Sequence, residues 1–447
     1  MDTHMLRKAI RTVTLVLALM TVGVLNCHAR IEGITGTSFN FLATQGHIST
    51  PEGGSILFWG YANAGGGVQY PGPTLIVNQG DTITITLTND LPLPVSMVFP
   101  GQENVTAQGG VQGLITQEAL NFDIPGTLED ESVVTYTFVA TRPGTYHYHS
   151  ATLPELEVEM GLVGAIIVRP AGFNPASPTA YGDTDSRYDR EYLFMLTEMD
   201  PRIHVMIERE GIATVFNTNY LSDYFPNYWF INGRCAPDTM SPPFAPWLPT
   251  QPYNCLPRMH PGERLLMRVI DGGRDLHPYH HHGNHSFIIA RNGRLLESFP
   301  GAGADLGNFV FTIKAIPGET VDAIFEWTGK NLGWDIYGTG PGFEHDCIDN
   351  DGDGFDDTTK EYCPDHGKPF PVILPEGQDL TVGDFYSGSP FLGVMGDLPP
   401  GTGSLNINGG FFFMWHSHNE KEMTNWGVFP GGMMTMLIIE PPGVPIE

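Results

Sequence analysis

Two pairs of histidines are the residues of this sequence best suited to hold a metal ion. His280 and His282 are two positions apart, and His416 and His418 repeat that spacing. On an extended strand, side chains two positions apart project from the same face, so each pair presents two imidazoles to one side. Several neutral imidazoles must converge to within about 2.0–2.1 Å of an ion to bind it. A lone histidine is more often a packed or surface residue, but two such pairs on neighbouring strands predict a metal centre.

A second pattern that could bind a metal is the run of carboxylates from Asp349 to Asp357. Calcium takes oxygen ligands, and a glycine in such a run permits the sharp turn that wraps them around the ion. Gly354 has that position, whereas Lys360 stands where a helix-loop-helix calcium site needs its twelfth ligand. The segment therefore predicts a simpler aspartate-repeat calcium loop, and the alternative is a solvated acidic loop. The expected calcium ligands are Asp349, Asp351, Asp353 and Asp357.

The elements that must position these residues are strands. Gly (54) and Pro (37) together exceed a fifth of the 447 residues, which is turn-rich and favours an all-β protein. Strand patterns at 70–77, 80–88, 144–150 and 160–168 recur in the same order at 260–270, 410–418 and 432–439. The length is too great for one core. The sequence thus predicts two β domains built on one plan.

This repeated plan resembles the cupredoxin sandwich, and the chain resembles two-domain members of the multicopper oxidase family over residues 31–172 and 188–445. The motifs that carry the resemblance are Pro71-Gly-Pro-Thr, His277-Pro-Tyr-His-His-His-Gly, and His416-Ser-His followed by Gly432-Met-Met. The resemblance implies two Greek-key cupredoxin-like β-sandwich domains.

The resemblance also implies copper ligands. It makes His277 the histidine of a blue-copper site and assigns to a copper cluster His149, His280, His282, His416 and His418. Two-domain relatives often assemble as trimers with metal sites between subunits, so a homotrimer is expected by analogy.

The chain departs from the family pattern at several ligand positions. Ser417 replaces the cysteine, and Glu422 stands where the following histidine usually lies. In the first half, Val98 and Pro100 occupy the positions of a histidine pair. Without a thiolate there is neither intense blue colour nor the usual electron path, so we predict that the blue-copper site is absent. Met433 or Met434 stands at the position of the axial copper ligand. A methionine beside the closing strand more often packs in the core, so we take core packing as the first interpretation and the axial ligand as the alternative.

The N-terminus has the pattern of an export signal. Basic residues precede an apolar run at 12–25, and Cys27-His28-Ala29 is a plausible cleavage site, so residues 1–29 are expected to be removed. The run is shorter than the ~20 residues that span a bilayer. We therefore expect a secreted or periplasmic protein with domains at 30–172 and 188–447, a linker at 173–187 and a Gly/Pro/Asp-rich insertion at about 328–406.

Four cysteines remain after removal of that segment. In an oxidising compartment they are expected to pair. Three pairings are possible, and short loops close most easily. We therefore predict Cys235–Cys255 and Cys347–Cys363.

Charge and motifs restrict the function. The formal charge of −28 excludes a basic surface for nucleic acid, and no hydrolase triad, phosphate loop or dinucleotide fingerprint is found. Two hypotheses remain. The first is a copper oxidoreductase with a one- or two-copper, non-blue centre that acts on a small molecule. The second is a non-catalytic copper-binding or calcium-stabilised surface protein.

Overall fold

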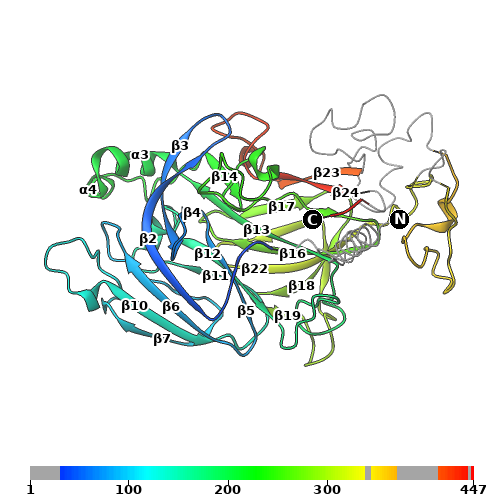
Figure 1. Ribbon diagram of the computed structural model, residues 1–447. Coiled ribbons are helices and arrows are strands. Elements are labelled where there is room, and N and C mark those ends of the chain that lie inside the picture. The colour runs from blue at the N-terminus through cyan, green and yellow to red at the C-terminus, as the bar shows by residue number, and fades with distance from the viewer. Residues whose placement is uncertain (1–30, 338–343, 370–410, 441–443, 447) are drawn as a thin grey trace, which may run out of the picture.

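Strands dominate the computed structural model, which describes residues 31–337, 344–369, 411–440 and 444–446 (Figure 1). A six-stranded sheet with the order β4-β3-β2-β6-β10-β7 and a four-stranded sheet with the order β1-β5-β12-β11 are built from strands that end before residue 170. The strands are β1 (Ile34–Thr35), β2 (Ser38–Ser49), β3 (Ser55–Asn63), β4 (Val68–Gln69), β5 (Gly72–Asn78), β6 (Thr82–Asn89), β7 (Glu103–Gly109), β10 (Val133–Val139), β11 (Gly144–His149) and β12 (Val163–Arg169); β8 (Val111–Gln112) and β9 (Gln117–Glu118) form a separate ribbon.

The second pair of sheets uses only strands that begin at or after residue 190. A seven-stranded sheet has the order β14-β13-β16-β22-β18-β19 with β20 on β18, and a five-stranded sheet has the order β15-β24-β23-β17-β21. The strands are β13 (Arg190–Met199), β14 (Tyr228–Ile231), β15 (Arg258–Met259), β16 (Arg264–Asp271), β17 (His277–His281), β18 (Ser286–Arg291), β19 (Arg294–Leu295), β20 (Asn308–Val310), β21 (Thr312–Ala315), β22 (Thr320–Glu326), β23 (Phe411–Ser417) and β24 (Met434–Ile439). The predicted all-β fold is confirmed.

The burial of the strands follows their sequence patterns. In β6 the apolar positions are buried and the threonines between them are more exposed, as the alternation predicts. β12 is buried along its whole length, because it pairs with β5 and β11 and its two faces contribute to different apolar clusters. Helices are short: α2 (Pro154–Glu157), α3 (Pro201–Glu210) and α4 (Ile212–Val215), with 3-10 turns η1 (Glu129–Glu131), η2 (Asp238–Met240), η3 (Cys363–Asp365) and η5 (Glu420–Met423).

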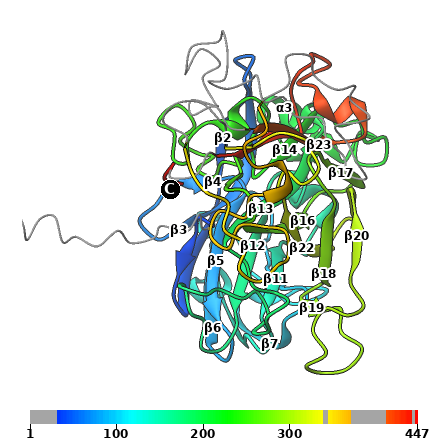
Figure 2. The same cartoon turned by 90° about the vertical axis from the view of Figure 1, so that its right-hand side faces the viewer.

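The two sandwiches meet along β11, which packs against β16 and β22 of the second sandwich (Figures 1 and 2). Arg268 on β16 lies at this interface with no exposed surface. Its guanidinium donates to the Thr145 hydroxyl at 2.9 Å and to Glu191 at 3.1 Å, and it pairs with Asp322 at 3.7 Å. Thr145 in turn donates to Asp322 at 2.6 Å. A buried charge network therefore joins the two halves.

One of the two predicted disulfides is confirmed. Cys347 and Cys363 are bonded, with S–S 2.04 Å. The prediction of Cys235–Cys255 is wrong: both are free thiols buried in different apolar clusters, and burial raises the pKa of each well above its usual value.

The loop between Cys235 and Cys255 is held by Arg234 instead of by a disulfide. This arginine has no exposed surface. Its guanidinium donates to backbone carbonyls around the loop, among them Gln251 at 2.8 Å, Ser241 at 3.0 Å and Pro252 at 3.2 Å. Arginine carries five N–H donors in a fixed fork, so one side chain can satisfy several carbonyls of a turn-rich loop.

Two sequence predictions concern residues that the structure describes in part or not at all. The export signal at 1–29 lies outside the described residues, as do 338–343 and 370–406 of the predicted insertion at about 328–406. No helix among the described residues is long and apolar enough to cross a membrane.

Candidate metal centre

Pairing between β17 and β23 brings the two histidine pairs together. His280 lies directly opposite His416 in the antiparallel ladder, and Tyr279 lies opposite Ser417. Residues opposite each other share a face of the sheet. Tyr279 and Trp415 occupy the other face and pack in the apolar core. Core packing of the alternate residues thus fixes the register and turns the imidazoles to one side.

The four predicted histidines of the second half form one cluster. The centroid of the His280 ring lies 4.6 Å from that of His282, 5.5 Å from that of His416 and 5.1 Å from that of His418. The Nε2 atoms of His282 and His416 are 3.2 Å apart. Nitrogens of His280, His282 and His416 all lie within 4.8 Å of one another, so one ion can reach all three.

The hydrogen bonds of these rings fit a ligand role. Nδ1 of His416 lies 2.7 Å from the carbonyl oxygen of Ser417. Because a carbonyl only accepts, Nδ1 carries the proton and the lone pair is on Nε2, facing His282. Nδ1 of His280 lies 2.9 Å from the Thr312 hydroxyl, which orients that ring as outer-shell partners of metal ligands do. Nδ1 of His282 is buried and has no hydrogen-bond partner among the described residues.

The electrostatics of the cluster keep these imidazoles neutral. Burial and the neighbouring histidines lower the pKa of His280 to about 4 and that of His282 to about 3. Burial also lowers the pKa of His416. A neutral ring presents a lone pair at pH 7, whereas a protonated one cannot bind a metal. Imidazole suits copper, zinc, iron and nickel, and divalent copper binds such nitrogen sites most tightly.

His418 differs from its neighbours in its exposure. Its side chain is 55% exposed, and Nδ1 lies 3.3 Å from the Glu420 carboxylate. The cluster is therefore open to solvent on the His418 side.

His149 lies outside this cluster within the chain. It ends β11, its Nδ1 lies 2.7 Å from the carbonyl oxygen of Ser150, and its ring stacks on His147 at 5.4 Å. Both rings line a cleft of about 280 Å³ with residues 271–274 of the second sandwich. Its local geometry repeats that of His416, including a proton on Nδ1. The lone pair of the His149 imidazole is therefore on Nε2.

His277 has the surroundings of a charged residue. It is fully buried, with Nδ1 2.9 Å from Glu422 and Nε2 3.0 Å from Glu198. Burial opposes protonation, but the hydrogen bonds and charges of the two carboxylates outweigh it and raise the pKa of His277 well above its usual value. Both ring nitrogens are engaged by carboxylates, so the structure does not bring His277 to a metal. Glu422 thus orients the imidazole of His277.

The residues at the other expected blue-copper positions are also engaged within the protein. Ser417 has no exposed surface, and its hydroxyl accepts from the Asn419 backbone at 3.2 Å. Met433 packs in the apolar core of the second sandwich. An imidazolium between two glutamates thus occupies the region that the family resemblance assigns to the blue copper.

The acidic loop brings three of its four predicted ligands together. Carboxylate oxygens of Asp349, Asp351 and Asp353 lie within 4.8 Å of one another. Asp357 turns instead to Asn350, whose side-chain amide it accepts at 2.5 Å.

Sequence reasoning missed a further group of potential ligands next to this loop. It consists of Asp335, His345, Glu361 and His366. The only local signal was that His345 and Glu361 each stand two positions before a bonded cysteine.

Parts of this chain are similar in sequence to known copper proteins. The sequence model of the family described as multicopper oxidase matches residues 62–172. Laccase abr2 of Aspergillus fumigatus is 38% identical over 104 residues, which are 23% of this chain and 16% of that protein. Copper resistance protein A of Escherichia coli is 31% identical over 140 residues, 31% of this chain and 20% of that protein. The alignments therefore span a fifth or less of these relatives.

Solved structures match over a larger share of the chain. The blue copper oxidase of Nitrosomonas europaea has a TM-score of 0.51 at 18% identity and covers 90% of this chain and 85% of its own. The multicopper oxidase mgLAC has a TM-score of 0.50 at 17% identity, covering 92% and 88%. At these identities the likeness shows the fold, and it confirms the predicted cupredoxin-type sandwiches. Residues 62–172 match the multicopper oxidase family, and the fold and the other sequence matches support a member of that family.

Proposed function

We propose that this protein binds copper at a single non-blue centre formed by His280, His282, His416 and His418. The observation that carries the proposal is the 3.2 Å approach of Nε2 of His282 to Nε2 of His416. Two neutral imidazole nitrogens at this distance, with a third nearby, are a ligand set for a first-row transition metal. The family relationship favours copper as that metal.

The chemistry open to such a centre differs from that of a laccase. Ser417 provides no thiolate, and His277 is paired with Glu198 and Glu422, so no relay from a surface substrate to the centre is available along this route. A reaction would have to take place at the centre itself. The exposure of His418 supports access by a small reductant, oxygen or peroxide. We therefore infer that an oxidoreductase of this kind would act on a small molecule.

The alternative is a non-catalytic protein that binds or sequesters copper. This alternative is favoured because Ser417, Val98 and Pro100 stand at positions where the family has the ligands it uses for electron transfer. Reoxidation of the reduced, copper-loaded protein discriminates between the two. Consumption of oxygen or peroxide with catalytic turnover of a small reductant supports the enzyme, and a single stoichiometric oxidation supports the binding protein.

Copper loading of the protein is expected to give a centre without strong visible colour. Imidazole nitrogens hold Cu(II), but the intense charge-transfer band of a blue site requires a thiolate. Absorption and electron spin resonance spectra of the loaded protein, together with its metal content, check this. Ser417→Cys is the matched comparison, because it restores only the missing ligand type. An intense visible band in the unaltered protein, or no bound copper after loading, would contradict the proposal.

We further propose that the loop from Asp349 to Asp357 binds calcium. Asp349 accepts the backbone N–H groups of Gly352 at 2.6 Å and Gly354 at 3.0 Å, which folds the loop around its three clustered carboxylates. Clustered like charges repel until a cation neutralises them. Extracellular modules of this type bind calcium at about 10⁻⁴–10⁻³ M.

Calcium is expected to protect this loop from proteolysis. A chelator should permit cleavage between Cys347 and Cys363, with the fragments held together until the disulfide is reduced. Asp351→Asn with Asp353→Asn should abolish the protection, and the exposed neighbour Asp346→Asn should retain it. Equal cleavage of the unaltered protein in calcium and in chelator would identify the segment as a solvated acidic loop.

Export and assembly are also proposals. The pattern at residues 1–29 supports secretion or a periplasmic location, which the N-terminal sequence of the mature protein tests. A homotrimer would allow Nε2 of His149 to reach a metal shared with another subunit. Sedimentation of the copper-loaded protein tests it, and a monomeric mass would refute the trimer.

A further inference from the structure

The insertion of the second half contains a compact group of two imidazoles and two carboxylates. Nε2 of His345 lies 3.0 Å from Glu361 and 3.8 Å from Asp335. Nδ1 of His366 lies 3.0 Å from the other oxygen of Glu361 and 3.6 Å from Asp335. One nitrogen or oxygen from each of the four side chains lies within 4.8 Å of all the others.

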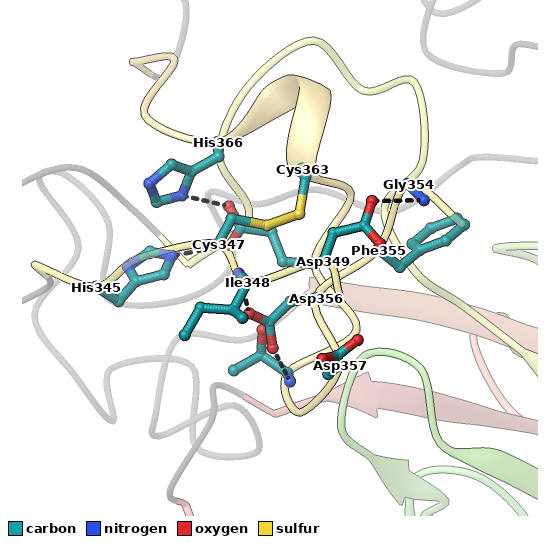
Figure 3. Close-up of a disulfide and its surroundings, with 12 residues drawn as sticks. His345, Cys347, Ile348, Asp349, Gly354, Phe355, Asp356, Asp357, Cys363 and His366 are labelled. Atoms are coloured by element: carbon teal, nitrogen blue, oxygen red, sulfur yellow. Dashed lines mark hydrogen bonds and ion pairs between the residues drawn. A yellow bond between two sulfur atoms is a disulfide. The ribbon is translucent and has the colours of Figure 1, made fainter. Parts of the chain in front are cut away.

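The disulfide fixes the chain segments that carry this group. His345 stands two positions before Cys347, Glu361 two positions before Cys363, and His366 three positions after it. Figure 3 shows both imidazoles on one side of the Cys347–Cys363 bond, with Asp349 and Gly354 of the acidic loop on the other. The covalent link therefore holds three of the four side chains in mutual reach, without the metal having to organise them.

The fourth side chain ties the group to the domain core. Asp335 follows Trp334, which is buried in the apolar cluster of the second sandwich. Oδ2 of Asp335 accepts a hydrogen bond from the Gly367 backbone at 3.0 Å. The backbone N–H of Asp335 donates to the Lys368 carbonyl at 2.9 Å. Both contacts orient the carboxylate towards His345 and His366. The group thus links the core of the second sandwich to the disulfide-closed loop.

The two buried carboxylates of this group carry negative charge that a bound cation would neutralise. Asp335 is 5% exposed and Glu361 is 1% exposed. Among the described residues, the ion pairs of these two carboxylates are with His345 and His366 alone, with no lysine or arginine. Two carboxylates buried close to each other repel one another unless a cation neutralises them. A divalent cation with two neutral imidazoles would offset both charges at once.

We propose that Asp335, His345, Glu361 and His366 bind one zinc ion that fastens the disulfide-closed insertion to the second sandwich. Two nitrogens and two carboxylate oxygens are a four-coordinate donor set of the kind that zinc accepts. All four positions are filled by protein, which is the pattern of a structural and not a catalytic zinc site. Calcium is disfavoured because it takes oxygen ligands in larger number. The site shares no residue with the four-histidine cluster.

The test measures zinc binding to the full mature chain with the other candidate sites removed from competition. His280→Ala with His416→Ala removes two ligands of the four-histidine cluster, and excess calcium occupies the acidic loop. In that background we expect one zinc per chain. Adding Glu361→Gln or His366→Ala should weaken zinc binding at least about 100-fold, the upper end of what loss of an outer-shell partner causes. Adding His47→Ala, an exposed histidine paired with Glu208, should leave zinc binding unchanged.

Cobalt(II) provides a second readout that does not depend on affinity. Bound at this site, it should show the intense visible bands of tetrahedral coordination, and Glu361→Gln should remove them. Circular dichroism and a thiol assay of Cys347 and Cys363 confirm that each variant is folded; if His366→Ala misfolds, the isosteric Glu361→Gln decides. Absence of zinc from the folded background protein, or equal affinity in Glu361→Gln and His47→Ala, would overturn the proposal.

Discussion

Replacing His280 and His416 together by alanine will abolish copper binding while the protein stays folded. The two side chains lie opposite each other on β17 and β23, and each is one of the three histidines whose nitrogens lie within 4.8 Å. Removing two of the ligands should weaken copper binding by more than the about 10–100-fold that loss of an outer-shell partner causes. The fold should persist, because the alternate residues Tyr279 and Trp415 still pack in the core. Equilibrium dialysis with copper and circular dichroism measure the two outcomes.

The matched controls for this experiment are two histidines of the same segment. His285→Ala should leave copper binding intact. His281→Ala should also retain copper, but at a cost in stability: His281 is fully buried, accepts from the Ser286 backbone at 3.1 Å and contacts Phe325 and Trp415. Unchanged copper stoichiometry in the double variant would show that the metal lies elsewhere. Loss of the fold together with the metal would make the centre a structural one.

Arg268→Met will strongly destabilise the protein. Methionine fills a similar volume but leaves the buried Asp322 without the cation it pairs with at the interface of the two sandwiches, and leaves Glu191 with Arg169. Burial already raises the pKa of Asp322 even with Arg268 beside it. Breaking a buried pair by removing one partner typically costs about 3–5 kcal/mol. Urea unfolding, followed by fluorescence, measures the change in the free energy of unfolding.

An exposed ion pair provides the control for Arg268. Arg187 pairs with Asp189 at 3.0 Å with its side chain 45% exposed, so Arg187→Met should cost about 0–1 kcal/mol. Adding Asp322→Asn to Arg268→Met should recover part of the loss, because Asp322 is the carboxylate left without a cation, whereas Glu191 still pairs with Arg169. If Arg268→Met unfolds at the same urea concentration as Arg187→Met, the network does not hold the halves together.

Features that depend on local periodicity were predictable from the sequence. The spacing of His280 and His282, and of His416 and His418, sets the side of the strand on which each pair lies, whatever the rest of the fold. Apolar alternation likewise predicted strands such as β6, and the repeat of those patterns predicted two sandwiches. The Cys347–Cys363 disulfide also followed from the sequence, because closing a short loop costs little entropy.

Contacts between distant segments could not be predicted in this way. Cys235 and Cys255 are 20 positions apart, close to the separation of 16 between the bonded Cys347 and Cys363, but Arg234 holds their loop and the two thiols pack in different clusters. His277 matched a ligand motif, yet Glu198 from β13 and Glu422 from η5 converge on it and keep it charged.

The same division separates the four-histidine cluster from the candidate zinc site. The sequence by itself predicted the four histidines and the face on which each pair lies, because each pair is local, whereas the pairing of β17 with β23 that joins the pairs is a contact of the tertiary structure. Only the tertiary structure brought Asp335 to His345, Glu361 and His366, since these residues come from separate turns of a segment without strand or helix periodicity. Their approach depends on the disulfide and on the anchoring of Trp334 in the core, which no local pattern encodes.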